Sequence, residues 1–244
     1  MNAPFVWFGG KRRVAREVWA ALGDVDQYVE PFAGSLAVLL ERPRWHRGTV
    51  ETVNDRDAYL ANFWRAVTAD PEAVARWCDW PVNETDLFAR HLWLVNEGRA
   101  RIAAMEDDPD FFDAKVAGWW VWGINAWIGS GWCSGSGPWR QRPHLGDAGR
   151  GVNSGSDMTA GGQGAPANVW DQSLCRDGEP PVYGYFRALA ARLRRVRVCC
   201  GDWARIVTDG ACAYGATVGV FLDPPYSGEV RTTADLYASD DHDV

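Results

Sequence analysis

The fold is decided by the stretch Val220-Phe221-Leu222-Asp223-Pro224-Pro225-Tyr226 near the end of the chain. Its first residues are β-branched, apolar or aromatic, which predicts a buried strand. Open parallel sheets bind ligands just past the carboxyl ends of such strands, and Asp223 follows this one directly. Proline fixes its own φ and restricts the residue before it. We therefore expect the Asp223 carboxylate and the Pro224 carbonyl to be held side by side.

Two fixed oxygen acceptors beside the Tyr226 ring suit the exocyclic amine of a planar base. The lone pair of such an amine is delocalised into the ring, so its nitrogen is a poor nucleophile. If both amine hydrogens are accepted, a pyramidal nitrogen that can attack an electrophilic methyl group is favoured. This chemistry requires no metal. Taken alone, the same string is also typical of a strand followed by a proline turn whose tyrosine packs on the core.

Composition limits the class of protein. With 244 residues and a hydrophobic fraction of 47%, the chain has enough apolar residues for a substantial core. It has neither an apolar run of about twenty residues nor a signal pattern, so we expect a cytoplasmic location. Six cysteines without metal-ligand spacing indicate reduced thiols. The net charge of -7 argues against non-specific coating of nucleic acid but not against a local basic groove.

Upstream of the opening stretch, strands and helices alternate in two blocks. The first block begins with a glycine pair and Lys11 before a helix, and such helix starts bind carboxylates or phosphates. The predicted elements are a helix at 14–22, a strand-turn-helix at 27–40, a strand at 49–53, a helix at 58–67, a helix at 183–193, and strands at 196–200 and 218–222. This order predicts an α/β fold with a Rossmann-like sheet.

Acids follow two of the predicted strands. Asp55 lies roughly twenty residues past the first turn, where folds of this kind hold a ribose diol. The alternative for Asp55 is a helix N-cap, and the two roles are compatible if Asn54 or Asp57 caps the helix. Asp202 and Trp203 follow a later strand and have the chemistry to hydrogen-bond and stack an adenine ring.

The alternation stops between Pro71 and about Pro181. The first part is predicted to be helical, and tryptophans at helical spacing there, together with five more between residues 117 and 132, are expected to be mostly core. Residues 129–168 are rich in glycine and polar residues and carry Arg140, Arg142 and Arg150. A loop of that length is a recognition region for phosphates and bases or a plain mobile surface loop.

Several motifs in a fixed order resemble the Dam-type (alpha-class) DNA adenine methyltransferases. The pieces are Pro-Phe-x-x-x-Gly-Gly-Lys at the start, Glu-Pro-Phe-x-Gly after the first strand, Asn-Asp after the second, Gly-Asp-Trp after a later strand, and Asp-Pro-Pro-Tyr. The resemblance implies a class I methyltransferase sheet that uses S-adenosyl-L-methionine. It also implies a catalytic domain at 1–70 and 182–244 and an inserted, mainly helical target-recognition region at 71–181.

The same resemblance assigns roles to single residues. The cofactor would be held by Trp7, Gly10, Lys11, Glu30, Phe32, Gly34, Asp55, Asp202 and Trp203. The target base would be held by Asp223, Pro224, Pro225 and Tyr226. The resemblance also points to Asn125 for contacts with double-stranded DNA, and the arginines of the long loop, Arg140, Arg142 and Arg150, are expected to contribute to the same contacts.

Three departures from the family pattern qualify this expectation. Ser35-Leu36 replaces further glycines of the cofactor turn, and the recognition region matches poorly, which leaves the target sequence open. Family members also continue well beyond Asp-Pro-Pro-Tyr, so the C-terminal part of the sheet is expected to be missing. We therefore expect a truncated chain, or half of a split enzyme whose open sheet edge pairs with a second polypeptide; otherwise we expect a monomer.

The predicted function is methyl transfer from S-adenosyl-L-methionine to the exocyclic amine of a flipped adenine in DNA. Two alternatives stay open. One is a catalytically inactive remnant that at most binds cofactor or DNA. The other is a methyltransferase for the exocyclic amine of cytosine, because both reactions need the same acceptors.

Overall fold

A computed structural model describes residues 1–7, 11–44, 48–128, 131–134, 172–174, 176, 178–212 and 217–224. Within these ranges four strands form one sheet: β1 (Gln27–Glu30), β2 (Val50–Asp55), β3 (Val196–Cys200) and β4 (Val218–Val220). Their order is β3-β2-β1-β4, and every neighbouring pair is parallel. This order is one part of the doubly wound arrangement, in which the chain reverses direction of growth beside the first strand. The predicted α/β, Rossmann-like fold class is therefore confirmed.

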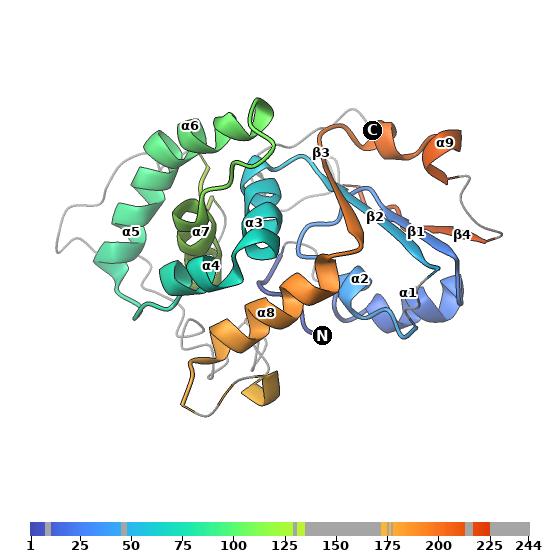
Figure 1. Cartoon of the computed structure of the whole chain (residues 1–244), viewed down its shortest axis with the longest axis horizontal. Coiled ribbons are helices and arrows are strands. Elements are labelled where there is room, and N and C mark those ends of the chain that lie inside the picture. The colour runs from blue at the N-terminus through green and yellow to red at the C-terminus, as the bar shows by residue number, and fades with distance from the viewer. Residues whose placement is uncertain are drawn as a thin grey trace.

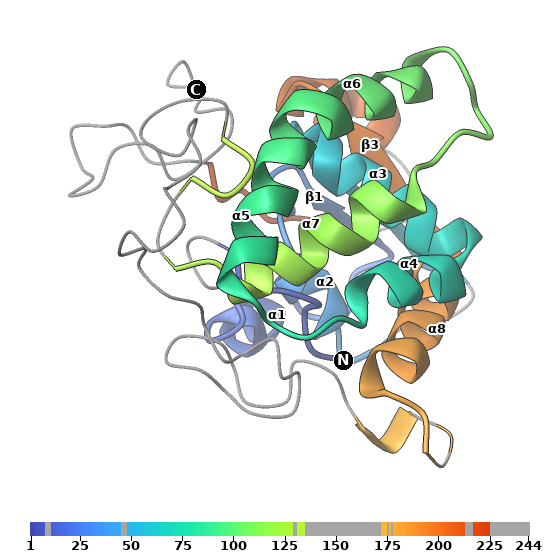
Figure 2. The same cartoon turned by 90° about the vertical axis from the view of Figure 1, so that its left-hand side faces the viewer.

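The helices occupy two regions of the molecule. They are α1 (Ala15–Leu22), α2 (Ala37–Leu40), α3 (Ala58–Ala69), α4 (Pro71–Cys78), α5 (Glu84–Trp93), α6 (Arg99–Ile102), α7 (Ala114–Ala126), α8 (Pro181–Leu193) and α9 (Asp209–Cys212). A π-helical segment, Leu94–Gly98, links α5 to α6. In Figure 1, α1 and α2 lie beside the sheet and α3 to α7 form a separate group. Figure 2 shows α4, α5 and α7 in front with the sheet behind them.

Local sequence explains where several helices begin. Asp57 caps α3 by accepting a hydrogen bond from the Tyr59 N–H at 2.8 Å. In the same way Asn83 caps α5 and Asp113 caps α7. These caps satisfy backbone donors that have no partner inside a helix. They set the starts of three helices that the apolar pattern alone places only approximately.

Two glycines let α7 pack closely against its neighbours. A Cβ at Gly118 would lie 2.7 Å from the Val74 carbonyl oxygen of α4, and one at Gly123 would lie 2.7 Å from Cε2 of Trp132. Both distances are far below a van der Waals contact. Glycine at these positions therefore brings α4 and Trp132 against α7.

A single hydrophobic cluster runs from the sheet into the helical group. The N-terminal segment lies at the junction, where the Phe5 ring contacts Trp120 of α7 and Phe63 of α3 at centroid distances of 5.0 and 5.8 Å. The two parts share this core, so the core does not mark a boundary between them. The predicted boundary between a catalytic domain and an inserted region stays a prediction.

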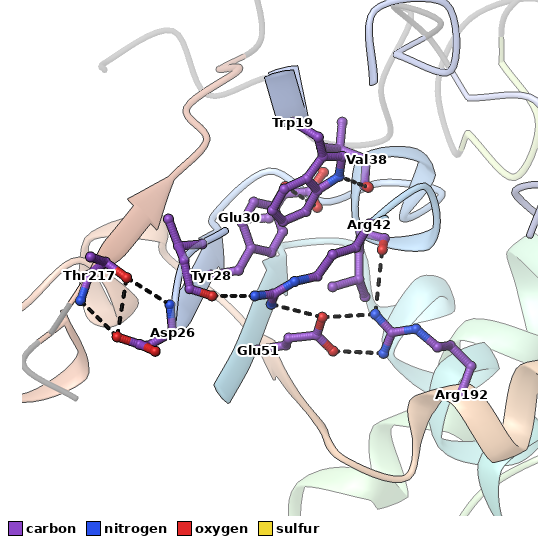
Figure 3. A network of polar contacts seen from close by, with 11 residues as sticks. Trp19, Asp26, Tyr28, Glu30, Val38, Arg42, Glu51, Arg192 and Thr217 are labelled. Carbon is purple, nitrogen blue, oxygen red and sulfur yellow. Dashed lines mark hydrogen bonds and ion pairs between the residues drawn. The ribbon is translucent and has the colours of Figure 1, made fainter. Parts of the chain in front are cut away.

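A buried ionic cluster connects α2, β2 and α8 (Figure 3). Arg192 makes two hydrogen bonds to the Glu51 carboxylate at 2.6 and 2.8 Å, and Arg42 makes a third at 3.1 Å. The Arg42 guanidinium also lies over the Trp19 ring at 5.1 Å and donates to the Val25 carbonyl. One carboxylate therefore holds two arginines against the sheet.

Three expectations about local structure need correction. β2 runs to Asp55 rather than Val53, because Asn54 and Asp55 pair with Cys199 and Cys200 of β3. β4 ends at Val220, and Leu222 is 54% exposed, so the predicted buried strand is shorter and less covered than expected. Its pairing within the described residues is to β1. Trp80 is 48% exposed rather than core.

Among the described helices, none has the length and apolar character needed to cross a membrane.

Candidate active site

The carboxyl ends of all four strands meet at one edge of the sheet. β1 ends at Glu30 and β2 at Asp55, while Asp202 and Asp223 follow β3 and β4. The point between β1 and β4 is where the strand order reverses, and ligands of doubly wound folds bind there. Parallel pairing therefore gathers acids that lie far apart in the sequence.

Lys11 and Asp223 form an ion pair across this point. Lys11 Nζ lies 2.7 Å from Asp223 Oδ1, and each side chain is 21% exposed. Asp223 is held near β1 because the Phe221 N–H donates to the Val29 carbonyl at 2.9 Å. The start of the chain and its last described strand thus supply opposite charges to one site.

Trp7 lies directly over the turn after β1. A Cβ at Gly34 would lie 2.5 Å from Trp7 Nε1 and 2.9 Å from Cγ, and Gly34 has a φ of +47°. Both the close approach and the left-handed backbone favour glycine. The Gly34 N–H donates to Asp55 Oδ2 at 3.0 Å. The turn is therefore held between an indole above it and a carboxylate at the end of β2.

Asp55 and Asp57 have different tasks in the loop after β2. Asp57 caps α3, whereas Asp55 accepts the Gly34 N–H through Oδ2 and the Asp57 N–H, at 3.0 Å, through Oδ1. The N-cap alternative for Asp55 is therefore wrong. Burial raises the pKa of Asp55, and burial together with the Asp55 charge raises the pKa of Asp57 to about 6. A third backbone N–H, that of Arg56, also lowers the pKa of Asp55, and a carboxylate with about four lone-pair positions still has one for another donor.

Glu30 is buried at the end of β1, with 2% of its surface exposed. Its Oε2 accepts a hydrogen bond from the Tyr28 hydroxyl at 2.9 Å. Burial, helped by the charges of Asp223 and Asp55, raises the pKa of Glu30 to about 8 against the lowering effect of the bonds from the Tyr28 hydroxyl and the Leu39 N–H. Glu30 is thus a largely protonated carboxyl at neutral pH beneath the site.

Two aromatic rings face one another across the ends of β1 and β3. The centroids of Phe32 and Trp203 are 6.0 Å apart, with an interplanar angle of 35°. Asp202 accepts the Ala204 N–H at 2.9 Å and so caps the short 3-10 helix that begins at Trp203. The chain offers an aromatic slot with a fixed carboxylate beside it.

Asn54 belongs to the same edge, although the sequence assigned it no binding role. Its Nδ2 donates to the carbonyls of Pro31 and Gly201, at 3.0 Å each. A polar residue inside a strand of a parallel sheet is the signal that identifies it, because such strands are usually apolar on both faces.

One predicted residue, Asn125, is not brought to this edge. Asn125 is 3% exposed and donates to the carbonyls of Pro4 and Val121, so its amide ties α7 to the N-terminal segment. Its contact with DNA stays a prediction. Six further predicted site residues lie outside the described ranges: Gly10, Pro225, Tyr226, Arg140, Arg142 and Arg150.

Comparison with known proteins gives one match. Residues 7–108 match the family model described as D12 class N6 adenine-specific DNA methyltransferase. This range contains β1, β2 and the residues Trp7, Lys11, Glu30, Gly34 and Asp55. None of the curated proteins compared with the chain matches it. The resemblance found in the motifs is thus confirmed by a match to the D12 class of N6 adenine-specific DNA methyltransferases, and this match covers residues 7–108, less than half of the 244-residue chain.

Proposed function

We propose that this protein methylates the exocyclic amine of an adenine flipped out of DNA, with S-adenosyl-L-methionine as the methyl donor. The family supports adenine-N6 methylation in general. The observation that carries the proposal is the position of Asp223 beside Lys11 at the reversal point of the sheet. There an acceptor for the base amine lies next to the residues proposed to hold the cofactor.

The residues at the strand ends fit this cofactor chemically. Gly34 lets the Trp7 indole lie directly on the turn, and the Asp55 carboxylate beside it suits a ribose diol. Phe32 and Trp203 supply faces for an adenine ring. Trp7 and Lys11 supply an indole and a cation for the methionine end. When bound, S-adenosyl-L-methionine supplies an electrophilic methyl group.

Asp223 and Pro224 would prepare the attacking nitrogen. The ion pair with Lys11 uses Asp223 Oδ1, and we assign Oδ2 and the Pro224 carbonyl to the two hydrogens of the base amine. Accepting both hydrogens frees the lone pair of the nitrogen and gives its departing proton a nearby acceptor. Lys11 would balance the charge of the carboxylate throughout.

The decisive experiment is transfer of label from methyl-labelled S-adenosyl-L-methionine to DNA, followed by analysis of the modified base. Label on the adenine amine is expected. Asp223→Ala should lower the rate by about 10²- to 10⁴-fold and leave the Kd of the cofactor nearly unchanged. Asp24→Asn is the matched control, because the Asp24 side chain is 47% exposed and its ion pair with Arg44 is long, at 3.7 Å.

The outcomes separate the alternatives. Label on the cytosine amine would establish the second alternative, and label on RNA or protein alone would contradict both. A non-catalytic protein would transfer nothing; if it also shows no rise in melting temperature at saturating cofactor, the proposed cofactor site is wrong as well. Replacing Arg140, Arg142 and Arg150 together tests their proposed contact with DNA by the change in the DNA Kd.

A further inference from the structure

Asn54 lies at the centre of the strand ends, buried between two loops. It is the penultimate residue of β2, which pairs with β1 on one side and β3 on the other, and 2% of its surface is exposed. Its Nδ2 donates to the carbonyl of Pro31, which precedes Phe32, and to the carbonyl of Gly201, two residues before Trp203. One amide group therefore connects the two loops that carry the facing rings.

Backbone bonds strengthen the same connection. The Ala33 N–H donates to the Asn54 carbonyl at 2.9 Å, and the Gly201 N–H donates to the Asp55 carbonyl at 3.1 Å. Each loop is therefore held to β2 by one backbone bond and by one bond from the Asn54 side chain, and the loop after β1 also by the Gly34 N–H, which donates to Asp55 Oδ2. The side chain is the group that joins both loops at once.

An asparagine at this position carries an energetic cost. Asn54 Oδ1 is buried and has no hydrogen-bond partner among the described residues, although burial without a partner costs an acceptor its hydration. The orientation is fixed, because two carbonyls require the NH₂ end. The cost of the unsatisfied oxygen is accounted for if the two bonds donated by Nδ2 contribute more than that cost by holding the loops in place.

The two bonds donated by Asn54 fix the separation of the Phe32 and Trp203 rings, and so the width of the slot between them. Their centroids are 6.0 Å apart, whereas a planar ring stacked between two faces needs about 7 Å, from two contacts of about 3.5 Å. The two rings, which are tilted by 35°, would therefore have to separate by about 1 Å for an adenine ring to stack between them. A small shift of either loop changes the fit.

We propose that Asn54 is a positioning residue that sets the width of the nucleoside slot by holding both loops to β2. The inference rests on the proposed function, because it takes the slot to receive the adenine of the cofactor. Asn54 contacts the loops and not the reacting atoms. Its replacement should therefore affect cofactor binding more than the chemical step.

The test uses binding of S-adenosylhomocysteine by calorimetry, which does not depend on turnover. Asn54→Asp keeps the shape of the side chain but places a carboxylate against two carbonyls, and should weaken binding at least tenfold at pH 8.5. At lower pH a protonated carboxyl regains one donor, so the affinity of this variant should recover relative to the wild type. In turnover assays the KM for the cofactor should rise while kcat is largely retained.

The matched control is Asn62→Asp in α3. Asn62 is also fully buried, and its amide makes two bonds of 2.9 Å to the backbone of Asp113 at the start of α7 rather than to either of the two loops. This variant should lose stability without a pH-dependent loss of affinity. If Asn54→Asp does not fold, Asn54→Ser, which keeps one donor, is expected to weaken binding by a smaller factor.

The two hypotheses fail in different ways. Wild-type protein that binds no S-adenosylhomocysteine would overturn the proposed function and the slot with it. Wild-type binding together with unchanged affinity in the folded Asn54 variants would overturn the positioning role alone. A pH-independent loss equal to that of the Asn62 control would reduce Asn54 to a structural residue.

Discussion

Replacement of Gly34 by alanine gives a quantitative test of the turn under Trp7. The new Cβ would lie 2.5 Å from Trp7 Nε1 and 2.9 Å from Cγ, so the ring would have to retreat by about 1 Å to reach normal contact. Retreat is opposed by the Phe5 and Trp120 rings, whose centroids lie 5.8 and 6.1 Å from that of Trp7.

The expected cost has two parts. A left-handed backbone costs alanine about 1–2 kcal/mol, and overpacking adds about 1–3 kcal/mol. The free energy of unfolding should therefore fall by about 2–5 kcal/mol in urea denaturation. Gly23→Ala is a strict control, because Gly23 has φ 72° and ψ -157° but has nothing within 4 Å of its Cβ position.

A double-mutant cycle isolates the clash. In a Trp7→Leu background the indole is gone, so Gly34→Ala should retain the backbone cost and lose most of the overpacking cost. Equal costs for Gly34→Ala in the two backgrounds would refute the contact with Trp7. A total cost for Gly34→Ala within the about 1–2 kcal/mol of the backbone alone would refute the steric argument as a whole.

Two further predictions concern buried charge. Glu51→Gln should lower the free energy of unfolding by about 3–5 kcal/mol, because Arg42 and Arg192 lose the carboxylate that they share; an effect below about 1 kcal/mol in urea denaturation would contradict this reading. Glu30 has an ordinary pKa of 4.5 and a folded pKa of about 8, raised mainly by burial. Between these values the folded protein keeps a proton that the unfolded chain has lost, so stability should fall as pH rises, by up to about 1.4 kcal/mol per pH unit. Glu30→Gln should flatten that slope in urea denaturation measured across pH; an unchanged slope would show that Glu30 is ionised in the folded state.

The periodicity of the sequence predicts the sheet well where strands are short and β-branched. The strand at 196–200 is placed correctly, and the helix expected at 14–22 begins one residue later, at Ala15. Boundaries fail where pairing decides them. β2 continues through Asn54 and Asp55 because β3 offers partners, and no local preference of asparagine or aspartate for strands predicts that extension.

The candidate site shows the same division. Motif spacing identifies Asp55 and Asp223, because strand ends and proline geometry are local properties of the chain. It includes Asn54 in the Asn-Asp motif but gives it no role, because its two carbonyl partners lie 23 and 147 residues away in sequence. Its role depends on which strands become neighbours.

The sequence by itself determined the alternation of strands and helices, the acids at the strand ends and the family resemblance, since each depends on residues close together in the chain. The tertiary structure alone decided that Lys11 meets Asp223 at 2.7 Å and that Phe32 faces Trp203. It also decided that Trp7 requires a glycine beneath it. The physical reason is that parallel strands bring their carboxyl ends to one edge, and only the order β3-β2-β1-β4 fixes which side chains meet there.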